Sequence, residues 1–159
     1  MTEKEKKRVI TVPEWHRMAM EGNTLPMRIP IHGNSMFPLI RMDRDYVTIL
    51  PLKDMPEIGD IVLYDDPDRD CYVLHRVWLI QDKHILTWGD NSYNTDGWRP
   101  LEDIWGKVVL IERGRIKIKP NPKRGLIWAR IWHSTAKTYR RYRGLAAEAY
   151  HRMKRLLKK

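Results

Sequence analysis

A serine in a segment bounded by glycine and proline is the first candidate for chemistry in this chain. Residues 33–38 read Gly-Asn-Ser-Met-Phe-Pro, which sets Ser35 between the flexible Gly33 and Pro38. Such a segment can place a hydroxyl on a tight, exposed turn beside free backbone N–H groups, as a nucleophile with an oxyanion site requires. Taken alone, a serine in a Gly/Pro loop is usually only a turn residue.

Two further segments carry groups that could assist such a nucleophile. His75 lies in the apolar, strand-like stretch 74–77, and residues 89–96 read Gly-Asp-Asn-Ser-Tyr-Asn-Thr-Asp, with carboxylates at Asp90 and Asp96. Taken alone, a strand histidine is more often a satisfied structural residue, and Gly-Asp-Asn is a common hairpin turn. A metal site built from this histidine and the two carboxylates is an alternative that gives the serine no role.

The order of these segments resembles the signal-peptidase and LexA-like serine peptidase superfamily. The matching boxes are Gly-x-Ser-Met-x-Pro at 33–38, Gly-Asp-Ile-Val at 59–62, His75 with Arg76, and Gly-Asp-Asn at 89–91 followed by Asp96. The resemblance runs from about residue 25 to residue 114, more than half of the chain. Each box is weak by itself, but four in this order are specific, and they imply a β domain that hydrolyses peptide bonds.

The resemblance implies a serine–histidine–aspartate mechanism. Ser35 matches the family nucleophile, and His75 stands where ordinary bacterial members carry lysine, which is similar to the endoplasmic-reticulum and archaeal branch. In that branch the acid lies six residues after the Asp of Gly-Asp-Asn, which here is Asp96. A neutral imidazole can accept the serine proton near pH 7, whereas a lysine base has to be desolvated first.

The resemblance also implies roles for neighbouring residues. Asp90 is expected to shape its turn or to act as a second catalytic carboxylate, and Arg76 to pair with a carboxylate near the site. Met36 resembles the apolar residue beside the substrate groove, and the Ser35 N–H is expected to donate to the oxyanion. The other predicted substrate-binding residues are Gly33, Asn34 and Pro38, and the other supporting residues are Gly89 and Asn91.

The chain departs from the family in ways that narrow its expected activity. Its first residues are charged and no apolar segment follows them, so no secretory signal is expected. It also has no apolar run of about 18 residues, so no membrane-spanning helix is expected. Many members carry serine where this chain has Gly33, a position closer to the LexA-like side. Self-cleavage of the LexA type is not expected, because the chain has no Ala-Gly pair and little sequence precedes the peptidase segment. Cleavage in trans is expected instead.

Local patterns predict the elements that must position these residues. Thr11 to Glu14 is typical of a capping box and begins a helix that reaches about Met20. After an extended segment flanked by Pro26 and Pro30, short segments up to about residue 119 that are rich in β-branched and aromatic residues predict an antiparallel, barrel-like β domain. The expected strands are 46–50, 58–64, 72–80, 84–88, 107–112 and 115–119. The predicted domains are an N-terminal segment with a short helix (1–24), a β peptidase domain (25–119) and a basic amphipathic helical tail (120–159).

Charge and cysteine content divide the chain further. Residues 1–119 hold 18 Lys and Arg against 19 Asp and Glu, whereas residues 120–159 hold 12 against Glu148 alone. An anionic partner should therefore meet the tail. The lone Cys71 excludes an intramolecular disulfide and a cysteine-built zinc site.

The tail has three possible partners. Apolar residues recur at helical spacing on one predicted face, namely Trp128, Trp132, Thr135, Tyr139, Tyr142, Ala146, Ala149, Met153 and Leu156. Residues 125–159 could lie on an anionic membrane surface, with Leu126, Ile127, Trp128, Ile131 and Trp132 in the interface. Packing on the body or on a second tail is the alternative, and nucleic acid is the least favoured partner because the body has no recognised nucleic-acid motif.

Together these features predict a serine endopeptidase without a cofactor. It would remove an N-terminal leader or signal-like peptide in trans, on the cytoplasmic side, peripheral to the inner face of the membrane. A partner could supply membrane anchoring. The alternative is a catalytically weak peptide-binding module of the same fold, which would bind an extended chain by strand addition. If the histidine is the base, activity should fall as acid protonates it.

Overall fold

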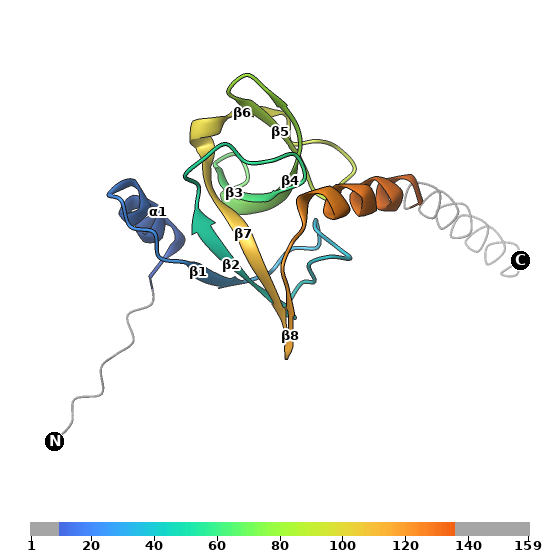
Figure 1. The fold of residues 1–159 in the computed structure, drawn as a ribbon, viewed down its shortest axis with the longest axis horizontal. Helices are drawn as coiled ribbons and strands as arrows, with labels where there is room; N and C mark the ends of the chain where they lie inside the picture. Colours follow the sequence, from blue (N-terminus) through green and yellow to red (C-terminus); the bar gives the residue numbers. More distant parts are fainter. Residues whose placement is uncertain (1–9, 136–159) are drawn as a thin grey trace, which may run out of the picture.

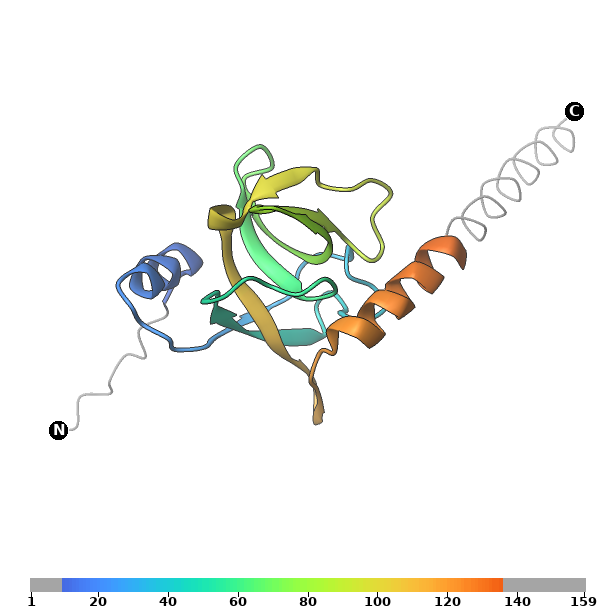
Figure 2. The same cartoon turned by 45° about the horizontal axis from the view of Figure 1, so that its top comes forward.

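The computed structural model describes residues 10–135, which form one curled antiparallel sheet with a helix on each of two opposite sides (Figures 1 and 2). The sheet has eight strands in the order β1-β2-β7-β3-β4-β5-β6, and β8 pairs with β7. The strands are β1 (Met27–Pro30), β2 (Asp45–Pro51), β3 (Ile61–Asp66), β4 (Cys71–Gln81), β5 (His84–Trp88), β6 (Trp98–Pro100), β7 (Ile104–Arg113) and β8 (Ile116–Ile118). The short 3₁₀ helix η1 (Leu101–Asp103) precedes β7.

Strand β7 joins the two halves of the sheet. It pairs with β2 along residues 106–113 and with β3 along residues 104–107, and both pairings are antiparallel. Among residues 10–135, β2 and β3 do not pair with each other. Strands β1 and β2 therefore belong to the same sheet as strands β3 to β5 only because β7 pairs with both β2 and β3.

The antiparallel, mainly β prediction is confirmed, whereas the barrel is not closed. Strands β1 and β6 are the two ends of the described sheet and do not pair with each other. Register shifts between Thr48 and Ile49, between Leu63 and Tyr64, and between Val77 and Leu79 bend the strands. These irregularities increase the local twist and curl the sheet without bringing its short edge strands together.

Strand boundaries differ from the prediction at three places. β1 and β6 were not expected as strands, because they are only four and three residues long and show no clear alternation. β3 begins at Ile61 rather than at Ile58, because Gly59 takes a φ of +102° and ends the preceding turn. β7 begins three residues earlier than expected, at Ile104.

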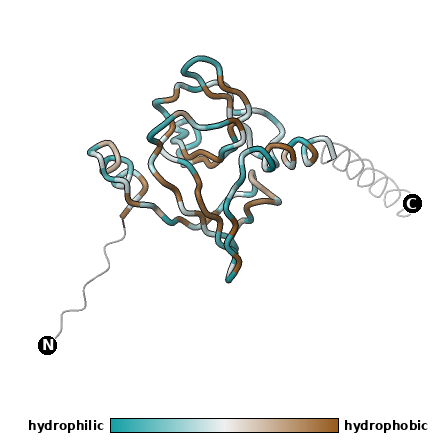
Figure 3. Tube along the Cα trace, in the orientation of Figure 1, coloured by the Kyte–Doolittle hydropathy of each residue, from teal (hydrophilic) through white to brown (hydrophobic). Residues whose placement is uncertain are grey.

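Buried apolar side chains form two clusters that meet opposite faces of β3, and hydrophobic residues follow the inner strands in Figure 3. The first cluster contains Trp15, Met27, Ile31, Met36, Ile40, Val47, Ile49, Ile61, Leu63, Val108 and Ile111. The second cluster contains Val62, Tyr64, Val73, Val77, Ile85 and Ile104. Successive residues Ile61 to Leu63 enter different clusters, since neighbouring side chains on a strand point to opposite faces.

The N-terminal helix α1 (Val12–Met20) forms as the capping box predicts. Thr11 accepts from the N–H of Glu14, and the Glu14 carboxylate accepts from the N–H of Thr11. Trp15 is the buried anchor of the helix, and its indole N–H donates to the carbonyl of Leu25 (2.9 Å). Helix α1 thereby covers the first apolar cluster at the β1–β2 end of the sheet.

The tail is helical over residues 122–135, but it uses a different face from the predicted stripe. Ala129 and His133 are buried and Trp132 is half-buried, whereas Trp128 is 66% exposed. The His133 ring lies 3.9 Å from the Trp88 ring, between centroids, and 5.2 Å from that of Trp78. This part of the helix packs on the body, and the stripe residues beyond Thr135 lie outside the described residues. Over residues 10–135, no helix combines the length and the apolar character that crossing a bilayer requires.

Candidate active site

Ser35 lies on the loop between β1 and β2, and buried side chains hold this loop from below. Met36 and Ile40 belong to the first apolar cluster, and the N–H of Ile40 donates to the carbonyl of Met36 (2.9 Å). From the other side, the N–H of Asn91 donates to the carbonyl of Ser35 (2.6 Å). The Asn91 side chain also donates to the carbonyl of Asn34 (3.2 Å). The serine therefore has a fixed backbone in the middle of an exposed loop.

A buried ion pair closes the same loop at its far end. Arg113 donates to both carboxylate oxygens of Asp45, at 2.9 Å and 2.7 Å, and to the carbonyl of Leu39 (2.9 Å). Burial alone would raise the pKa of Asp45, but hydrogen bonds from Arg113 and from the Arg41 N–H, with the charges of both arginines, hold this pKa below its usual value. The ionised carboxylate ties the loop to the end of β7.

His75 lies on β4 with its side chain buried beside Asp96. Its Nδ1 lies 2.5 Å from Asp96 Oδ2, and only 4% of the histidine side chain is exposed. Thr87 on β5 donates to the same carboxylate oxygen (3.1 Å). The Tyr64 hydroxyl lies 3.4 Å from His75 Nδ1. These neighbours set the orientation of the imidazole ring.

The Asp96 carboxylate stays ionised although it is buried. Burial raises its pKa, but the hydrogen bond and charge of His75 and the hydrogen bonds of Tyr64 and Thr87 outweigh that effect and hold the pKa below its usual value. Burial keeps Tyr64 in its phenol form, because it raises the pKa of that hydroxyl well above the ordinary tyrosine value. An ionised carboxylate can only accept, so His75 Nδ1 must carry the proton that is shared with Asp96. In a neutral ring, Nε2 then presents its lone pair, as a general base must.

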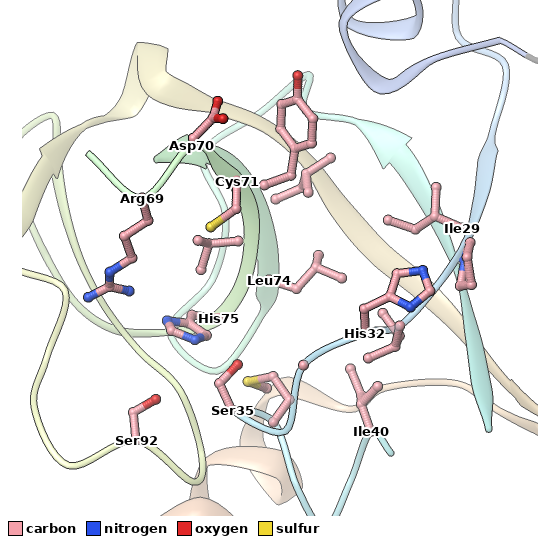
Figure 4. Close-up of a pocket in the computed structure, with 17 residues that line it drawn as sticks. Ile29, His32, Ser35, Ile40, Arg69, Asp70, Cys71, Leu74, His75 and Ser92 are labelled. Carbon is pink, nitrogen blue, oxygen red and sulfur yellow. The ribbon is translucent and has the colours of Figure 1, made fainter. Parts of the chain in front are cut away.

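Ser35 and His75 line one cavity of about 610 Å³. In Figure 4 they lie at the same end of this cavity, near Ser92. The cavity walls are mainly apolar and come from β1 (Ile29, Pro30), from the loop after it (Ile31, Met36, Ile40) and from β3 and β4 (Leu63, Val73, Leu74). Between these described side chains, the structure records no direct hydrogen bond from Ser35 Oγ to His75. Catalytic contacts of this kind commonly tighten only when substrate is bound.

Gly89 has no room for a side chain, because its Cα faces His75 and the carbonyl of Ser35. A Cβ at this position would lie 2.7 Å from His75 Nε2 and 2.9 Å from the carbonyl oxygen of Ser35, and closer still to Ser92 Oγ. The predicted supporting role of Gly89 thus has a steric basis, since this backbone must pass between the histidine and the serine loop.

Replacing Gly89 with alanine is therefore expected to lower any turnover at this site by about 100-fold, because displacing a reacting group by about 1 Å has that effect. The thermal unfolding transition checks that the variant still folds. Turnover within threefold of wild type would show that Gly89 does not border the reacting groups.

Asp90 lies apart from the histidine and pairs with Arg76. Arg76 donates from Nε to Asp90 Oδ1 (2.8 Å), from Nη2 to Asp90 Oδ2 (2.6 Å) and from Nη1 to the carbonyl of Gly59 (2.7 Å). Both side chains are at least 95% buried. Arg76 pairs with a carboxylate as predicted, and this pairing favours the predicted turn-shaping role of Asp90 over its catalytic alternative. A bidentate pair occupies both of its oxygens and fixes the turn that carries Gly89 and Asn91.

The predicted substrate-binding residues do not all reach the same cavity. Gly33 and Met36 line the cavity that holds Ser35 and His75. Asn34 contributes its carbonyl to the contact with Asn91 instead. Pro38 lies instead on a separate cavity of about 380 Å³ beneath the 122–135 helix, so the structure does not bring it together with Ser35 and His75. The chain turns away from the first cavity after Met36, because Met36 itself is buried in the core.

Four further residues of this site were not predicted from the sequence. Tyr64 and Thr87 contact the histidine–aspartate pair, Ser92 Oγ lies near His75 Nε2, and Arg69 approaches the second Asp96 oxygen (3.8 Å). Tyr64 and Thr87 are polar groups inside strands that otherwise read as apolar core, which is a signal that could have identified them. Ser92 and Arg69 lie in turns, where serine and arginine carry no such signal.

The depressed pKa of Asp96 predicts a pH dependence of stability. A carboxyl whose pKa is lower in the folded chain than in the unfolded chain stabilises the fold above the unfolded pKa and ceases to do so as the pH falls through the folded one. The wild type should therefore lose its advantage over Asp96→Asn progressively as the pH falls below about 4, because free Asp titrates near that pH. Urea unfolding at several pH values measures this difference. A difference that grows toward low pH would contradict the assignment.

The described residues do not form the metal site that the sequence left as an alternative. Within residues 10–135, no three His, Cys, Asp or Glu side chains gather in an arrangement that could hold a metal ion, and Asp90 is turned toward Arg76 rather than His75. Cys71 is a free, exposed thiol at the rim of the larger cavity.

The sequence matches no family model and no curated protein.

Proposed function

We propose that this protein is a serine endopeptidase of the signal-peptidase and LexA-like type, with Ser35 as nucleophile, His75 as general base and Asp96 as orienting acid. The observation that carries the proposal is the pairing of His75 Nδ1 with the ionised Asp96 at 2.5 Å, next to a cavity that the serine also lines. A buried pair of this kind prepares Nε2 to accept a proton from a group inside the cavity.

The proposed reaction follows from these positions. Ser35 Oγ attacks the carbonyl carbon of the scissile bond, and its proton moves to His75 Nε2. The tetrahedral intermediate collapses, the C–N bond breaks, and the same proton passes to the leaving amine. Water then attacks the acyl-enzyme and gives a proton to His75 Nε2. The C–O bond to Ser35 breaks, the peptide acid leaves, and the proton returns to Ser35 Oγ. Asp96 stabilises the imidazolium that forms in both steps.

The backbone N–H of Ser35 is the proposed donor to the oxyanion. Among residues 10–135 it has no hydrogen-bond partner, whereas the nearby N–H of Phe37 is already paired with the carbonyl of Asn34 (3.1 Å). A donor held by a fixed backbone needs no reorganisation as charge develops on the carbonyl oxygen. The hydrogen bond from Asn91 to the Ser35 carbonyl supports that orientation.

An extended peptide is the substrate that this cavity suits. Its walls include β1, an end strand of the described sheet, and residues 71–75 of β4, which pair with β3 but not with β5. Two strand segments with one unpaired side each can take an added strand through main-chain hydrogen bonds. The apolar walls favour small or medium apolar side chains near the scissile bond, as in a leader or signal-like segment. We also propose that the protein cleaves its substrate on the cytoplasmic side of the membrane.

New N-termini in a peptide library test the proposal. Wild-type protein should generate a consistent set of cuts that a metal chelator does not reduce and that Ser35→Ala does not produce. The sequences before the cuts would define the side chains that the cavity accepts. Capture of library peptides without any new N-terminus, by wild type and Ser35→Ala alike, would favour the peptide-binding module and would contradict the peptidase.

A further inference from the structure

The outward face of the 122–135 helix carries large apolar side chains that the body does not cover. Ile127, Trp128 and Ile131 are 58%, 66% and 50% exposed, and their spacing places them side by side on one face. Ala129 and His133 turn the opposite face toward the body. We call Ile127, Trp128 and Ile131 the outer face of the helix.

The helix that carries this outer face and the β8 segment before it are rich in positive charge and contain no acidic residue. Residues 114–135 contain no Asp or Glu, and their six cations are all exposed: Arg115, Lys117, Lys119, Lys123, Arg124 and Arg130. Within residues 10–135, none of the six forms an ion pair. The sequence beyond residue 135 adds nine more Lys and Arg against Glu148 alone.

We infer that the outer face docks on a lipid bilayer with anionic headgroups. A tryptophan and two isoleucines beside exposed Lys and Arg are the residues that an interfacial helix inserts and the residues that it directs toward lipid phosphates. A second copy of the chain fits less well, because a two-fold contact through this face would bring the same uncompensated cations together. Nucleic acid would use the cations but would leave the three apolar side chains without a role.

Docking at this face would also position the candidate active site. Trp132 of the same helix contacts the ring of Phe37 (5.6 Å between centroids), and Phe37 lies two residues after Ser35. Trp128, at the edge of the outer face, and Trp132 share a cavity with Pro38 and Leu39 of the serine loop. A bilayer on the outer face would therefore hold the serine loop near the surface, where membrane-associated peptides are concentrated.

Vesicle sedimentation with the full chain tests the inference. At 0.15 M salt, about the physiological value, wild type should bind phosphatidylglycerol-containing vesicles at least about tenfold more tightly than pure phosphatidylcholine vesicles, since each Lys or Arg near an anionic surface adds about 1 kcal/mol. Ile127→Ser with Ile131→Ser should weaken that binding by about tenfold or more. Leu79→Ser is the matched control, because Leu79 is a similarly exposed side chain (49%) on β4 and should change binding less than twofold. Circular dichroism verifies that each variant folds.

Replacing the helix cations distinguishes their contribution to vesicle binding from that of the apolar outer face. Lys123→Gln with Arg124→Gln and Arg130→Gln should weaken binding and reduce its dependence on salt. Three results would overturn the inference. One is that wild type binds neither vesicle, and another is that the double isoleucine variant binds vesicles as wild type does. The third is that the double variant loses a dimer or a nucleic-acid complex, rather than vesicle binding. Ser35→Ala should bind vesicles as wild type does, so failure of membrane docking and failure of the peptidase proposal are distinguishable.

Discussion

Replacing Ser35 with alanine is expected to lower peptide cleavage by about 10⁴-fold or more. The alanine removes the proposed nucleophile, so no acyl-enzyme can form at this position, and serine nucleophiles in triads generally account for factors of this size. Ser35 forms no side-chain hydrogen bond within the described residues, so the fold should be preserved. Initial rates on a peptide found by the library experiment, with the unfolding temperature of both proteins, measure the two effects.

Two other serines provide controls for that experiment. Ser92 Oγ lies near His75 Nε2, whereas Ser134 lies on the exposed side of the 122–135 helix. Ser134→Ala should retain wild-type activity. Ser92→Ala should lower activity by about tenfold at most, because Ser92 can adjust the histidine but is not expected to attack the peptide. If Ser92→Ala lost activity while Ser35→Ala stayed active, Ser92 rather than Ser35 would be the nucleophile.

Replacing Arg76 with methionine is expected to cost about 3–5 kcal/mol of folding free energy. The change leaves the Asp90 carboxylate buried without its partner, and breaking one side of a buried ion pair is far more destabilising than removing the whole pair. The carbonyl of Gly59 also loses its donor. For a chain of this length the unfolding temperature should fall by about 10 °C. Urea unfolding measures the free energy directly.

An exposed pair supplies the matched control for Arg76. Arg28 donates to Glu112 at 2.6 Å, but the arginine side chain is 51% exposed, so Arg28→Met should cost less than about 1 kcal/mol. The double variant Arg76→Met with Asp90→Leu should recover most of the loss, because no charge then remains buried. An Arg76→Met protein as stable as the Arg28→Met protein would contradict the buried-pair argument.

Local signals predicted the elements that local interactions determine. The capping box at Thr11 marked the start of α1, and the alternating segment 84–88 matched β5 residue for residue. Strands β1 and β6 were not predicted, because both are short and depend on pairing with other strands rather than on a local pattern. β1 pairs with residues about twenty positions later, and β6 consists of three residues that follow a loop. Whether the barrel closes likewise depends on bulges that the sequence does not mark.

The candidate site shows the same division between pattern and geometry. Ser35, His75 and Asp96 were found through the order of short boxes, and two of them pair directly in the structure. Spacing alone could not separate Asp90 from Asp96, because the separation depends on which carboxylate meets Arg76 across the β4–β5 region. In the helix, periodicity predicted an apolar face but could not say which side packs on Trp78 and Trp88.

The central position of β7 also determines when the site can assemble. The loop that carries Ser35 connects β1 and β2, whereas His75 lies on β4 and Asp96 on the loop between β5 and β6. In the described residues, strand pairing connects these two parts only through residues 104–113 of β7. A chain leaving the ribosome therefore contains all three residues before it contains the strand that unites the two parts. Such non-local pairing folds slowly, because distant segments must meet before their contacts stabilise them. The growing chain thus has no assembled site until its last long strand is in place.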